Sequence, residues 1–378
     1  MQLKDIKDLF LKYKEDGLFN RYITNLHIEP ILGNFDDQVV VEIIGNSVLN
    51  NPIYGLKIGN GGKKILMWSQ MHGNESTTTK ALFDLLNTFI GNESTTNEIL
   101  EACSLYIIPI LNPDGALAYT RVNANKVDLN RDAQNLTQPE SRVLRQVFES
   151  FKPDFCYNLH GQRTIFSAGN ISRSATVSFL APAQDEACTI TPNRKVAMEV
   201  IGIMNKALQE AIPNQVGVYD DAFNLNCVGD TFQSEDVPTI LFEAGHFHND
   251  YEREKTRELI YIAYIKSLEY ISKVEVSGDN YEPYLSIPEN EKCFLDIIIR
   301  NTKTEKGIVD IGIQYVEKLS DNIIEFIPEV VKIEKLDNFF GHREIEAQGY
   351  EVYNGEGGVL VEGSENVFVM LNNEKILL

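Results

Sequence analysis

Two kinds of segment alternate along the first 274 residues of the chain. Short, continuously apolar runs predict buried strands at 65–70, 105–111, 154–159 and 239–242. Amphipathic stretches predict helices at the N-terminus and near 76–90, 139–151, 194–211 and 252–272. Buried strands that alternate with helices indicate an α/β domain. We expect a mixed, mostly parallel sheet flanked by helices.

The last hundred residues follow a different pattern. Short strand-like runs at 293–299, 307–313, 323–327 and 367–371 are separated by turn residues, and no helical periodicity is evident. The change falls near the turn-rich stretch 276–280. We therefore expect two domains, an α/β domain over 1–274 and a small β-sandwich or barrel over 275–378.

Composition narrows the possible partners. Lys and Arg total 34 against 55 Asp and Glu, so the net charge of −21 would repel a phosphate backbone and argues against nucleic acid. No run approaches the ~18 apolar residues of a membrane span, which argues against a membrane partner. The mixed-charge start lacks a secretory signal, and the five widely spaced cysteines suit free thiols in a reducing compartment. We expect a cytoplasmic protein; its oligomeric state is open.

Four side chains with metal or acid–base chemistry follow predicted strands. His72 and Glu75 come after the first strand, His160 ends the strand 154–159, and Glu243 follows the strand 239–242. The carboxyl ends of strands in an open α/β sheet form the ligand crevice, so these groups should converge. Two histidines and one carboxylate form a donor set suited to one catalytic Zn²⁺ with an open fourth position.

Ordered motifs between these residues carry a family resemblance. Asn-Pro-Asp-Gly at 112–115 is followed by Arg121-Val-Asn123 and then by Asp-Leu-Asn-Arg at 128–131. With His-Gly-Asn-Glu at 72–75, Leu-His-Gly at 159–161 and Glu-Ala-Gly at 243–245, the chain resembles the zinc carboxypeptidases. The resemblance spans about residues 43–272.

The resemblance implies a role for each matched residue. It implies that Zn²⁺ is held by His72, Glu75 and His160. It further implies that Glu243 is the catalytic carboxylate and that Arg121 polarises the scissile carbonyl. Asn130 and Arg131 match the residues that bind the substrate's terminal carboxylate, for which a planar guanidinium is well suited.

Other positions near the site leave alternatives open. Tyr219 matches, loosely, a tyrosine that covers bound substrate in this family, but it could equally be a packing residue. The segment 225–233 corresponds to the family's specificity pocket, where Asp230 could favour a basic residue or simply be solvated. His246 and His248 could bind substrate, support the metal ligands, or be exposed loop residues.

The leading interpretation is a zinc-dependent metallocarboxypeptidase that uses a metal-activated water to hydrolyse a C-terminal peptide bond. The first alternative is a zinc-dependent deacylase of N-acyl amino acids, because the chain is also similar to aspartoacylase and succinylglutamate desuccinylase. The second alternative is a non-catalytic peptide-binding protein. In all three, the partner is a peptide or acyl amino acid with a free carboxylate.

Overall fold

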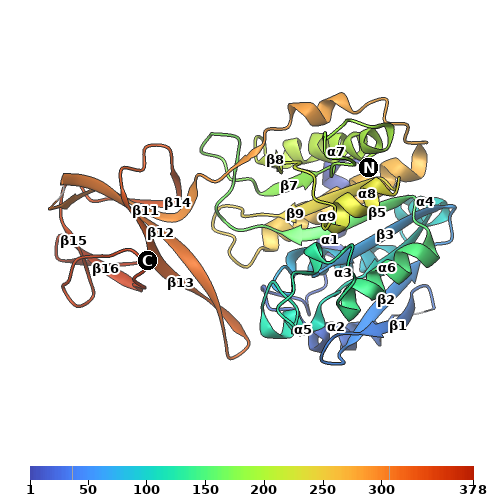
Figure 1. Cartoon of the computed structure of the whole chain (residues 1–378), viewed down its shortest axis with the longest axis horizontal. Coiled ribbons are helices and arrows are strands. Elements are labelled where there is room, and N and C mark those ends of the chain that lie inside the picture. The colour runs from blue at the N-terminus through green and yellow to red at the C-terminus, as the bar shows by residue number, and fades with distance from the viewer. Residues whose placement is uncertain (36, 306) are drawn as a thin grey trace. The chain divides into compact units, whose positions relative to one another are not determined.

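The structure is a computed structural model that describes residues 1–35, 37–305 and 307–378. It divides into two compact units (Figure 1). Unit 1 contains Met1–Gln162 and Ala175–Asn290, and unit 2 contains Arg163–Ser174 and Glu291–Leu378. The division therefore falls later in the chain than the expected boundary at 274/275, and it assigns an internal segment to unit 2.

Unit 1 is built on an eight-stranded sheet with the order β1-β2-β4-β3-β5-β9-β7-β8. The central pairs β3/β4, β3/β5 and β5/β9 are parallel, whereas β1/β2, β2/β4 and β7/β9 are antiparallel. This confirms the predicted mixed, mostly parallel sheet. Its strands are β1 (Val40–Asn46), β2 (Pro52–Ile58), β3 (Lys63–Ser69), β4 (Cys103–Ile108), β5 (Phe155–Gly161), β7 (Val177–Leu180), β8 (Val216–Val218) and β9 (Thr239–Ala244).

Helices cover both faces of this sheet (Figure 1). Alternate side chains of β3 enter two hydrophobic clusters, with Ile65 and Met67 in one and Leu66 and Trp68 in the other. The larger cluster receives α1 (Leu3–Tyr13), α2 (Asn25–Leu32), α3 (Thr77–Ile90), α4 (Ser94–Ala102), α5 (Pro113–Ala118), α7 (Pro192–Ala211) and α9 (Glu254–Lys273). The smaller one receives α6 (Pro139–Phe151), α8 (Val228–Ser234) and the 3₁₀ turn η1 (Leu129–Arg131). A second 3₁₀ turn, η2 (Glu282–Ser286), packs on α7.

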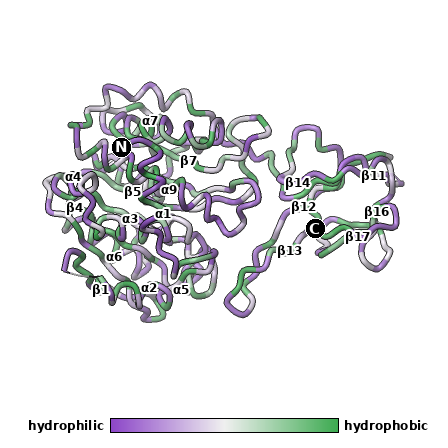
Figure 2. Tube along the Cα trace, turned by 180° about the vertical axis from the view of Figure 1, so that it is seen from behind, coloured by the Kyte–Doolittle hydropathy of each residue, from purple (hydrophilic) through white to green (hydrophobic). Residues whose placement is uncertain are grey.

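Unit 2 consists of β-sheets, as predicted. Its two larger sheets have the orders β13-β12-β11-β14 and β15-β16-β17, and β6 pairs with β10 in a third. Residues from both enter one hydrophobic cluster, as in a sandwich. The strands are β6 (Ser167–Ala168), β10 (Asn290–Glu291, where the chain enters the unit), β11 (Phe294–Thr304), β12 (Gly307–Ser320), β13 (Ile323–Glu334), β14 (Phe340–Glu346), β15 (Val352–Asn354), β16 (Phe368–Leu371) and β17 (Glu374–Leu377). Hydrophobic and hydrophilic residues are interspersed along β12 and β13 (Figure 2).

The segment 163–174 is held inside unit 2 by polar contacts. Thr164 Oγ1 donates to Asp296 Oδ2 at 3.2 Å and accepts from Gln314 Nε2 at 2.6 Å. Its carbonyl oxygen lies 2.7 Å from His342 Nε2. All four residues except His342 are buried. Unit 2 therefore receives a loop that leaves unit 1 directly after β5.

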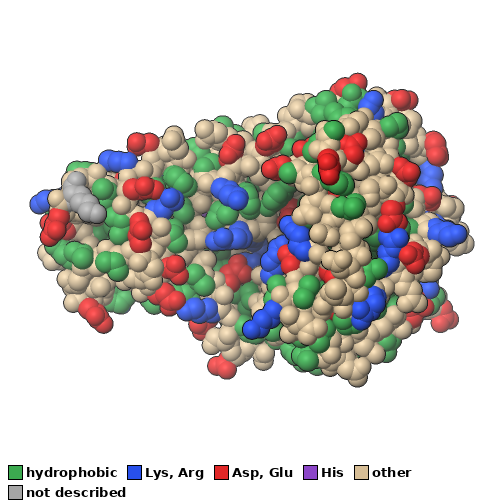
Figure 3. All heavy atoms as spheres, viewed as in Figure 1, with side chains coloured by type: hydrophobic (Ala, Val, Ile, Leu, Met, Phe, Trp, Pro, Cys, Tyr) green, Lys and Arg blue, Asp and Glu red, His purple; other side chains and the backbone are tan. Residues whose placement is uncertain are grey.

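The surface is charged and mixed in sign. Acidic and basic side chains are interspersed on the face seen in Figure 3. Across the described residues, no helix has both the length and the apolar character needed to cross a bilayer.

Candidate active site

Three strand ends bring the predicted metal ligands and the predicted catalytic acid together. His160 lies in β5 directly opposite Glu243 in β9, and β3 runs parallel to β5 on its other side. After β3 the chain turns sharply. Buried Gln70 adopts a positive φ of 44°, and its amide donates to the carbonyl oxygen of Gly73 at 2.7 Å. This turn directs His72 toward β5.

Gly73 allows the turn to approach its neighbour closely. A Cβ at this position would lie 1.9 Å from the carbonyl carbon of Gly115 in α5. Asn112 caps the same helix, because its side chain accepts from Gly115 N at 2.8 Å. The Asn-Pro-Asp-Gly motif therefore shapes the helix start against which the metal-ligand loop packs.

The three predicted ligands form one compact cluster. Nδ1 of His72 and Nδ1 of His160 lie 3.1 Å apart. The first is 2.9 Å from Glu75 Oε1 and the second 3.0 Å from Glu75 Oε2. Both histidines are only 2% exposed and Glu75 is 11% exposed. In the described part of the chain this is the set of His, Cys, Asp and Glu residues that could hold a metal ion.

The chemistry of this donor set fits a zinc ion. Donors about 2.1 Å from a tetrahedral Zn²⁺ lie roughly 3.4 Å from one another. The separations between these atoms, 2.9 to 3.1 Å, are only slightly shorter. These two buried imidazole nitrogens lie 3.1 Å apart, and their lone pairs repel each other when both nitrogens are unprotonated. A cation bound between them would relieve this repulsion. His72, Glu75 and His160 would hold the ion and leave a fourth position open.

Nearby charges and burial favour the forms of Glu75 and His160 that bind a cation. Although burial opposes ionisation, His72 and His160 hold the pKa of Glu75 far below its usual range. Burial lowers the pKa of His160 and favours its neutral form. For His72, burial is outweighed by the charge of Glu75 and the hydrogen bond to Asp128, so its pKa rises.

Asp128 contacts the metal-ligand cluster directly. Its Oδ1 lies 3.0 Å from Nε2 of His72, on the side of the ring opposite Glu75. A carboxylate in this position orients a metal-binding imidazole and fixes its tautomer. Asp128 Oδ2 also accepts from Arg121 Nε at 3.1 Å. The Asp-Leu-Asn-Arg motif at 128–131 is the sequence signal that identifies this residue.

The guanidinium of Arg121 contacts both Asp128 and Glu75. One guanidinium nitrogen lies 3.0 Å from Asp128, and another lies 3.4 Å from Glu75 Oε1. The side chain is 48% exposed, so it remains accessible to a ligand. The structure therefore places a cation beside the predicted metal ligands, as its predicted role requires.

Glu243 faces the same crevice and is partly exposed. Its Oε2 has no hydrogen-bond partner among the described residues. Burial raises the pKa of Glu243 well above its ordinary value, and the negative charge of Glu75 adds to the rise. A carboxylate with a raised pKa can accept and release a proton near neutral pH.

Asn130 and Arg131 lie beside Asp128 in η1. Asn130 is buried; its backbone N–H donates to Asp128 Oδ1 at 2.9 Å, and its side-chain oxygen accepts from Val228 N at 3.0 Å. Arg131 is exposed and donates to the carbonyl oxygen of Asn130 at 2.7 Å. Asn130 is therefore linked to the metal cluster through Asp128, and Arg131 follows it in the same turn.

Tyr219 and Asp230 also lie near the site. Burial raises the pKa of Tyr219 strongly, and the negative charges of Glu243 and Glu75 contribute to the rise. Asp230 is 8% exposed, and burial raises its pKa to about 6. Because Asp230 is this buried, the alternative of a solvated acid is wrong.

The two histidines after β9 differ from each other. His246 is 1% exposed, and its ring packs on Tyr251 with centroids 4.6 Å apart. His248 is exposed and lies 3.1 Å from the side-chain amide of Asn249. An exposed loop position is therefore correct for His248 and wrong for His246.

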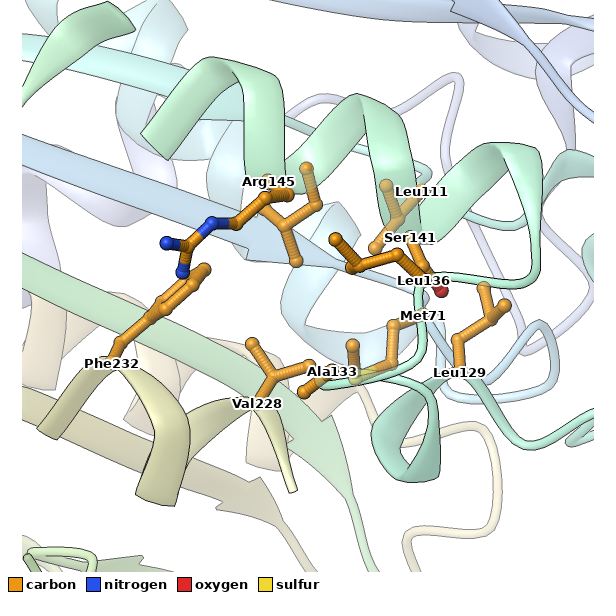
Figure 4. A pocket seen from close by; sticks show the side chains of 10 residues that line it. Met71, Leu111, Leu129, Ala133, Leu136, Ser141, Arg145, Val228 and Phe232 are labelled. Carbon is orange, nitrogen blue, oxygen red and sulfur yellow. The ribbon is translucent and has the colours of Figure 1, made fainter. Parts of the chain in front are cut away.

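An apolar pocket is lined in part by residues that neighbour the site residues in sequence (Figure 4). Its lining includes Met71, which precedes His72, and Leu129, which precedes Asn130. Val228 and Phe232 of α8 complete this side of the pocket. Neighbours of the site residues are thus anchored in one hydrophobic cluster.

Comparison with known proteins agrees with this geometry. The sequence profile described as "Zinc carboxypeptidase" matches residues 27–226, more than half of the chain. The chain belongs to the zinc carboxypeptidase family. The predicted family is therefore confirmed. The His-Glu-His site is present, and it is consistent with one Zn²⁺.

Individual relatives are similar only over parts of their length. "Carboxypeptidase 2" of Trichophyton rubrum is 29% identical over 100 residues, which cover 26% of this chain and 19% of that protein. "Gamma-D-glutamyl-L-diamino acid endopeptidase 1" of Lysinibacillus sphaericus is 36% identical over 80 residues, 19% of this chain and 20% of that protein. The chain thus spans about a fifth of the length of each.

The fold has solved counterparts. The structure of carboxypeptidase A from Helicoverpa armigera superposes with a TM-score of 0.54 at 15% identity, covering 71% of this chain and 80% of that one. At such low identity the likeness concerns the fold alone. It agrees with the predicted carboxypeptidase-like architecture of the α/β part.

Proposed function

We propose that this protein is a zinc-dependent metallocarboxypeptidase that removes the C-terminal residue of a peptide. The observation that carries the proposal is the cluster of His72, Glu75 and His160, with Glu243 directly opposite His160 on the next strand. Membership of the zinc carboxypeptidase family supports it.

The surrounding side chains suit peptide-bond hydrolysis. A zinc ion in such a donor set supplies Lewis acidity that activates water at neutral pH. Glu243 takes the proton of the attacking water and passes it to the leaving amine, which its raised pKa favours. Arg121, beside the cluster and 48% exposed, donates to the scissile carbonyl oxygen as negative charge develops there.

The remaining residues suit recognition of a chain end. The exposed guanidinium of Arg131 and the side-chain amide of Asn130 bind the terminal carboxylate of the substrate. Tyr219, whose pKa is raised in part by the negative charge of Glu243, covers the bound residue. Binding of a terminal carboxylate beside the metal cluster restricts hydrolysis to the last peptide bond.

A substrate panel tests this function against the deacylase alternative. Zinc-loaded protein is assayed with N-blocked dipeptides and with N-acyl amino acids of matched length. A further arm uses a γ-D-glutamyl-L-diamino acid peptide, the kind of bond named for the Lysinibacillus relative. We expect turnover of the dipeptides that is lost on chelation and restored by zinc. Turnover of the acyl amino acids alone would refute the peptidase assignment.

A matched variant tests the role of Glu243. Glu243→Gln keeps the shape of the side chain but cannot accept the water proton. It should retain one equivalent of zinc and lose most turnover, a decrease in kcat of about 100-fold or more. Near-normal turnover with bound zinc would exclude Glu243 from the mechanism.

A further inference from the structure

Arg253 is a buried cation directly before α9. The residue is 1% exposed, and its backbone adopts a left-handed conformation with a φ of 61°. Residues other than glycine occupy this region uncommonly, and such positions cluster at functional sites. A buried guanidinium also loses its hydration, so it needs hydrogen-bond acceptors inside the protein. The acceptors of Arg253 therefore indicate what this residue does.

The guanidinium of Arg253 joins the ends of two functional strands. Its Nη1 donates to the carbonyl oxygen of Ala244 at 3.0 Å, and its Nη2 donates to the carbonyl oxygen of Gln162 at 3.1 Å. Ala244 directly follows Glu243 on β9, and Gln162 comes two residues after His160 at the end of β5. Because the guanidinium is planar and rigid, it sets the separation of the two carbonyl groups that it binds.

The ladder between β5 and β9 ends at this point. Its last pair is Gly161 with Ala244, one step beyond the pair His160 and Glu243. Past that pair, the backbone N–H of Gln162 donates to the same Ala244 oxygen at 3.0 Å. The ends of an element open more readily than its centre, so support here has the greatest effect on the spacing of the two strand ends.

The end of β5 also contacts the metal ligands. The backbone N–H of Gly161 donates to Glu75 Oε2 at 3.0 Å, and the same carboxylate oxygen lies 3.0 Å from Nδ1 of His160. Glu243 lies directly opposite His160 on β9. A shift between the ends of β5 and β9 would therefore change the distance between the metal cluster and Glu243.

The loop that presents this guanidinium is itself fixed to the strand end. Asp250 accepts from the backbone N–H groups of Glu254 and Thr256 at 2.8 and 2.9 Å. Thr256 Oγ1 donates to the carbonyl oxygen of Gly245, the first residue after β9, at 3.1 Å. The loop therefore leaves β9 and is bonded back to its end, which gives the guanidinium a defined position.

We propose that Arg253 is a positioning residue that fixes the distance between Glu243 and the metal ligand His160 by holding the carbonyl groups at the ends of their strands. This inference rests on the proposed function and deepens it. Proton transfer requires the carboxylate to lie within about 3 Å of the water. A misplacement of about 1 Å can lower the rate of such a reaction about 100-fold.

This role predicts a loss of kcat with little change in binding. The zinc ligands belong to β5 and to the turn after β3, whereas Glu243 belongs to β9. The residues proposed to bind the substrate terminus, Asn130 and Arg131, belong to η1. A displacement of the end of β9 should therefore move Glu243 and leave zinc binding and KM nearly unchanged.

Two substitutions of Arg253 test this separation. Arg253→Lys keeps the positive charge but loses the planar fork, and Arg253→Met removes all donors from a long side chain. With N-blocked dipeptides, we expect kcat to fall about 10-fold in the lysine variant and about 100-fold in the methionine variant. KM should stay within about 3-fold of the wild-type value, and one equivalent of zinc should be retained. A wild-type kcat in Arg253→Lys would refute the role of the fork.

Arg257, in the first turn of α9, provides a matched control. It is fully buried, and it donates to the carbonyl oxygens of Leu18 and Glu15 at 2.5 and 2.8 Å. Arg257→Lys makes the same chemical change away from β5 and β9. It should lower the melting temperature and leave kcat within about 2-fold of the wild-type value. An equal fall of kcat in Arg253→Lys and Arg257→Lys would mean that Arg253 only stabilises the fold.

Hydrogen exchange provides a readout that is independent of turnover. The amide of Gln162, which donates to Ala244, should exchange at least about 10-fold faster in Arg253→Met than in the wild-type protein, and at the wild-type rate in Arg257→Lys. Unchanged exchange in Arg253→Met would refute the proposal. Thr256→Val, which removes the hydroxyl that holds the loop to Gly245, should give a weaker form of both effects and replaces the Arg253 variants if these do not fold.

The two proposals fail in different ways. A wild-type protein that hydrolyses no dipeptide would refute the proposed function, while the exchange rate of Gln162 still decides whether Arg253 holds the strand ends. An active wild-type protein whose kcat is unchanged in Arg253→Met would leave the proposed function standing and refute the positioning role alone.

Discussion

Asp230 offers a quantitative test of the electrostatics near the site. It lies in the first turn of α8, 8% exposed, and its Oδ1 accepts from the backbone N–H of Asn224 at 3.1 Å. Burial nevertheless raises its pKa from 3.8 to about 6, and this outweighs the hydrogen bonds to the carboxylate and the charges of Arg131 and Arg194. Ionisation of Asp230 therefore destabilises the folded protein.

The size and sign of that cost follow from the two pKa values. The folded state binds the proton of the Asp230 carboxyl more tightly than the unfolded state does. The free energy of unfolding therefore falls as pH rises between about 4 and 6. Above pH 6 the full penalty is present, and about two pKa units correspond to about 3 kcal/mol. Asp230→Asn removes the charge but keeps an oxygen that can accept from Asn224. We expect it to stabilise unit 1 by up to about 3 kcal/mol at pH 8 and by only about 1 kcal/mol at pH 4.5.

Urea unfolding at the two pH values measures this difference. Trp68, the only tryptophan of the chain, packs edge-on against Phe232 of α8 with centroids 5.5 Å apart, so its fluorescence reports on this part of unit 1. Asp279→Asn, at an exposed position, serves as the control for the general effect of pH. An equal change at both pH values, or a less stable variant at pH 8, would refute the reasoning.

Two further substitutions test contacts described above. Asp128→Asn removes the negative charge beside Nε2 of His72. The affinity for zinc, measured by competition with a chelator, should fall about 10- to 100-fold. An unchanged affinity would mean that Asp128 does not orient the His72 ring. Asp84→Ala leaves the fully buried guanidinium of Arg257 without its main counter-charge. The free energy of unfolding of unit 1, measured with urea, should fall by about 3 kcal/mol or more. A loss below about 1 kcal/mol would contradict the view that Asp84 is the main counter-charge of Arg257.

The parts of the fold with strong hydrophobic periodicity could be predicted from the sequence. The strand expected at 154–159 is β5, Phe155–Gly161, and the helix expected at 252–272 is α9, Glu254–Lys273. Both are deeply buried, so their apolar residues form unbroken or regularly spaced runs. The metal ligands could be located for the same reason, because His72 and His160 mark the ends of such strands.

Elements that are half exposed or very short could not be predicted. β1 lies at the sheet edge, and its residues are exposed or only partly buried, so no continuous apolar run identifies it. The short helix α8 contains Gly229 and Asp230, which are typical of turns. Arg253 sits in the polar stretch 252–257, and only its hydrogen bonds show that it joins the ends of β5 and β9.

The two-unit organisation shows why local patterns do not locate a domain boundary here. Thr164 bonds to Asp296, 132 residues away in sequence, and no periodicity can report such a contact. A chain cut at residue 274 would lose Asp296, Gln314 and the other partners of the 163–174 segment. It would also lose Tyr284 of η2, a buried residue of the larger hydrophobic cluster of unit 1. Because β5 carries the metal ligand His160 immediately before that segment, such a cut would remove the partners of the loop that directly follows a metal-binding strand.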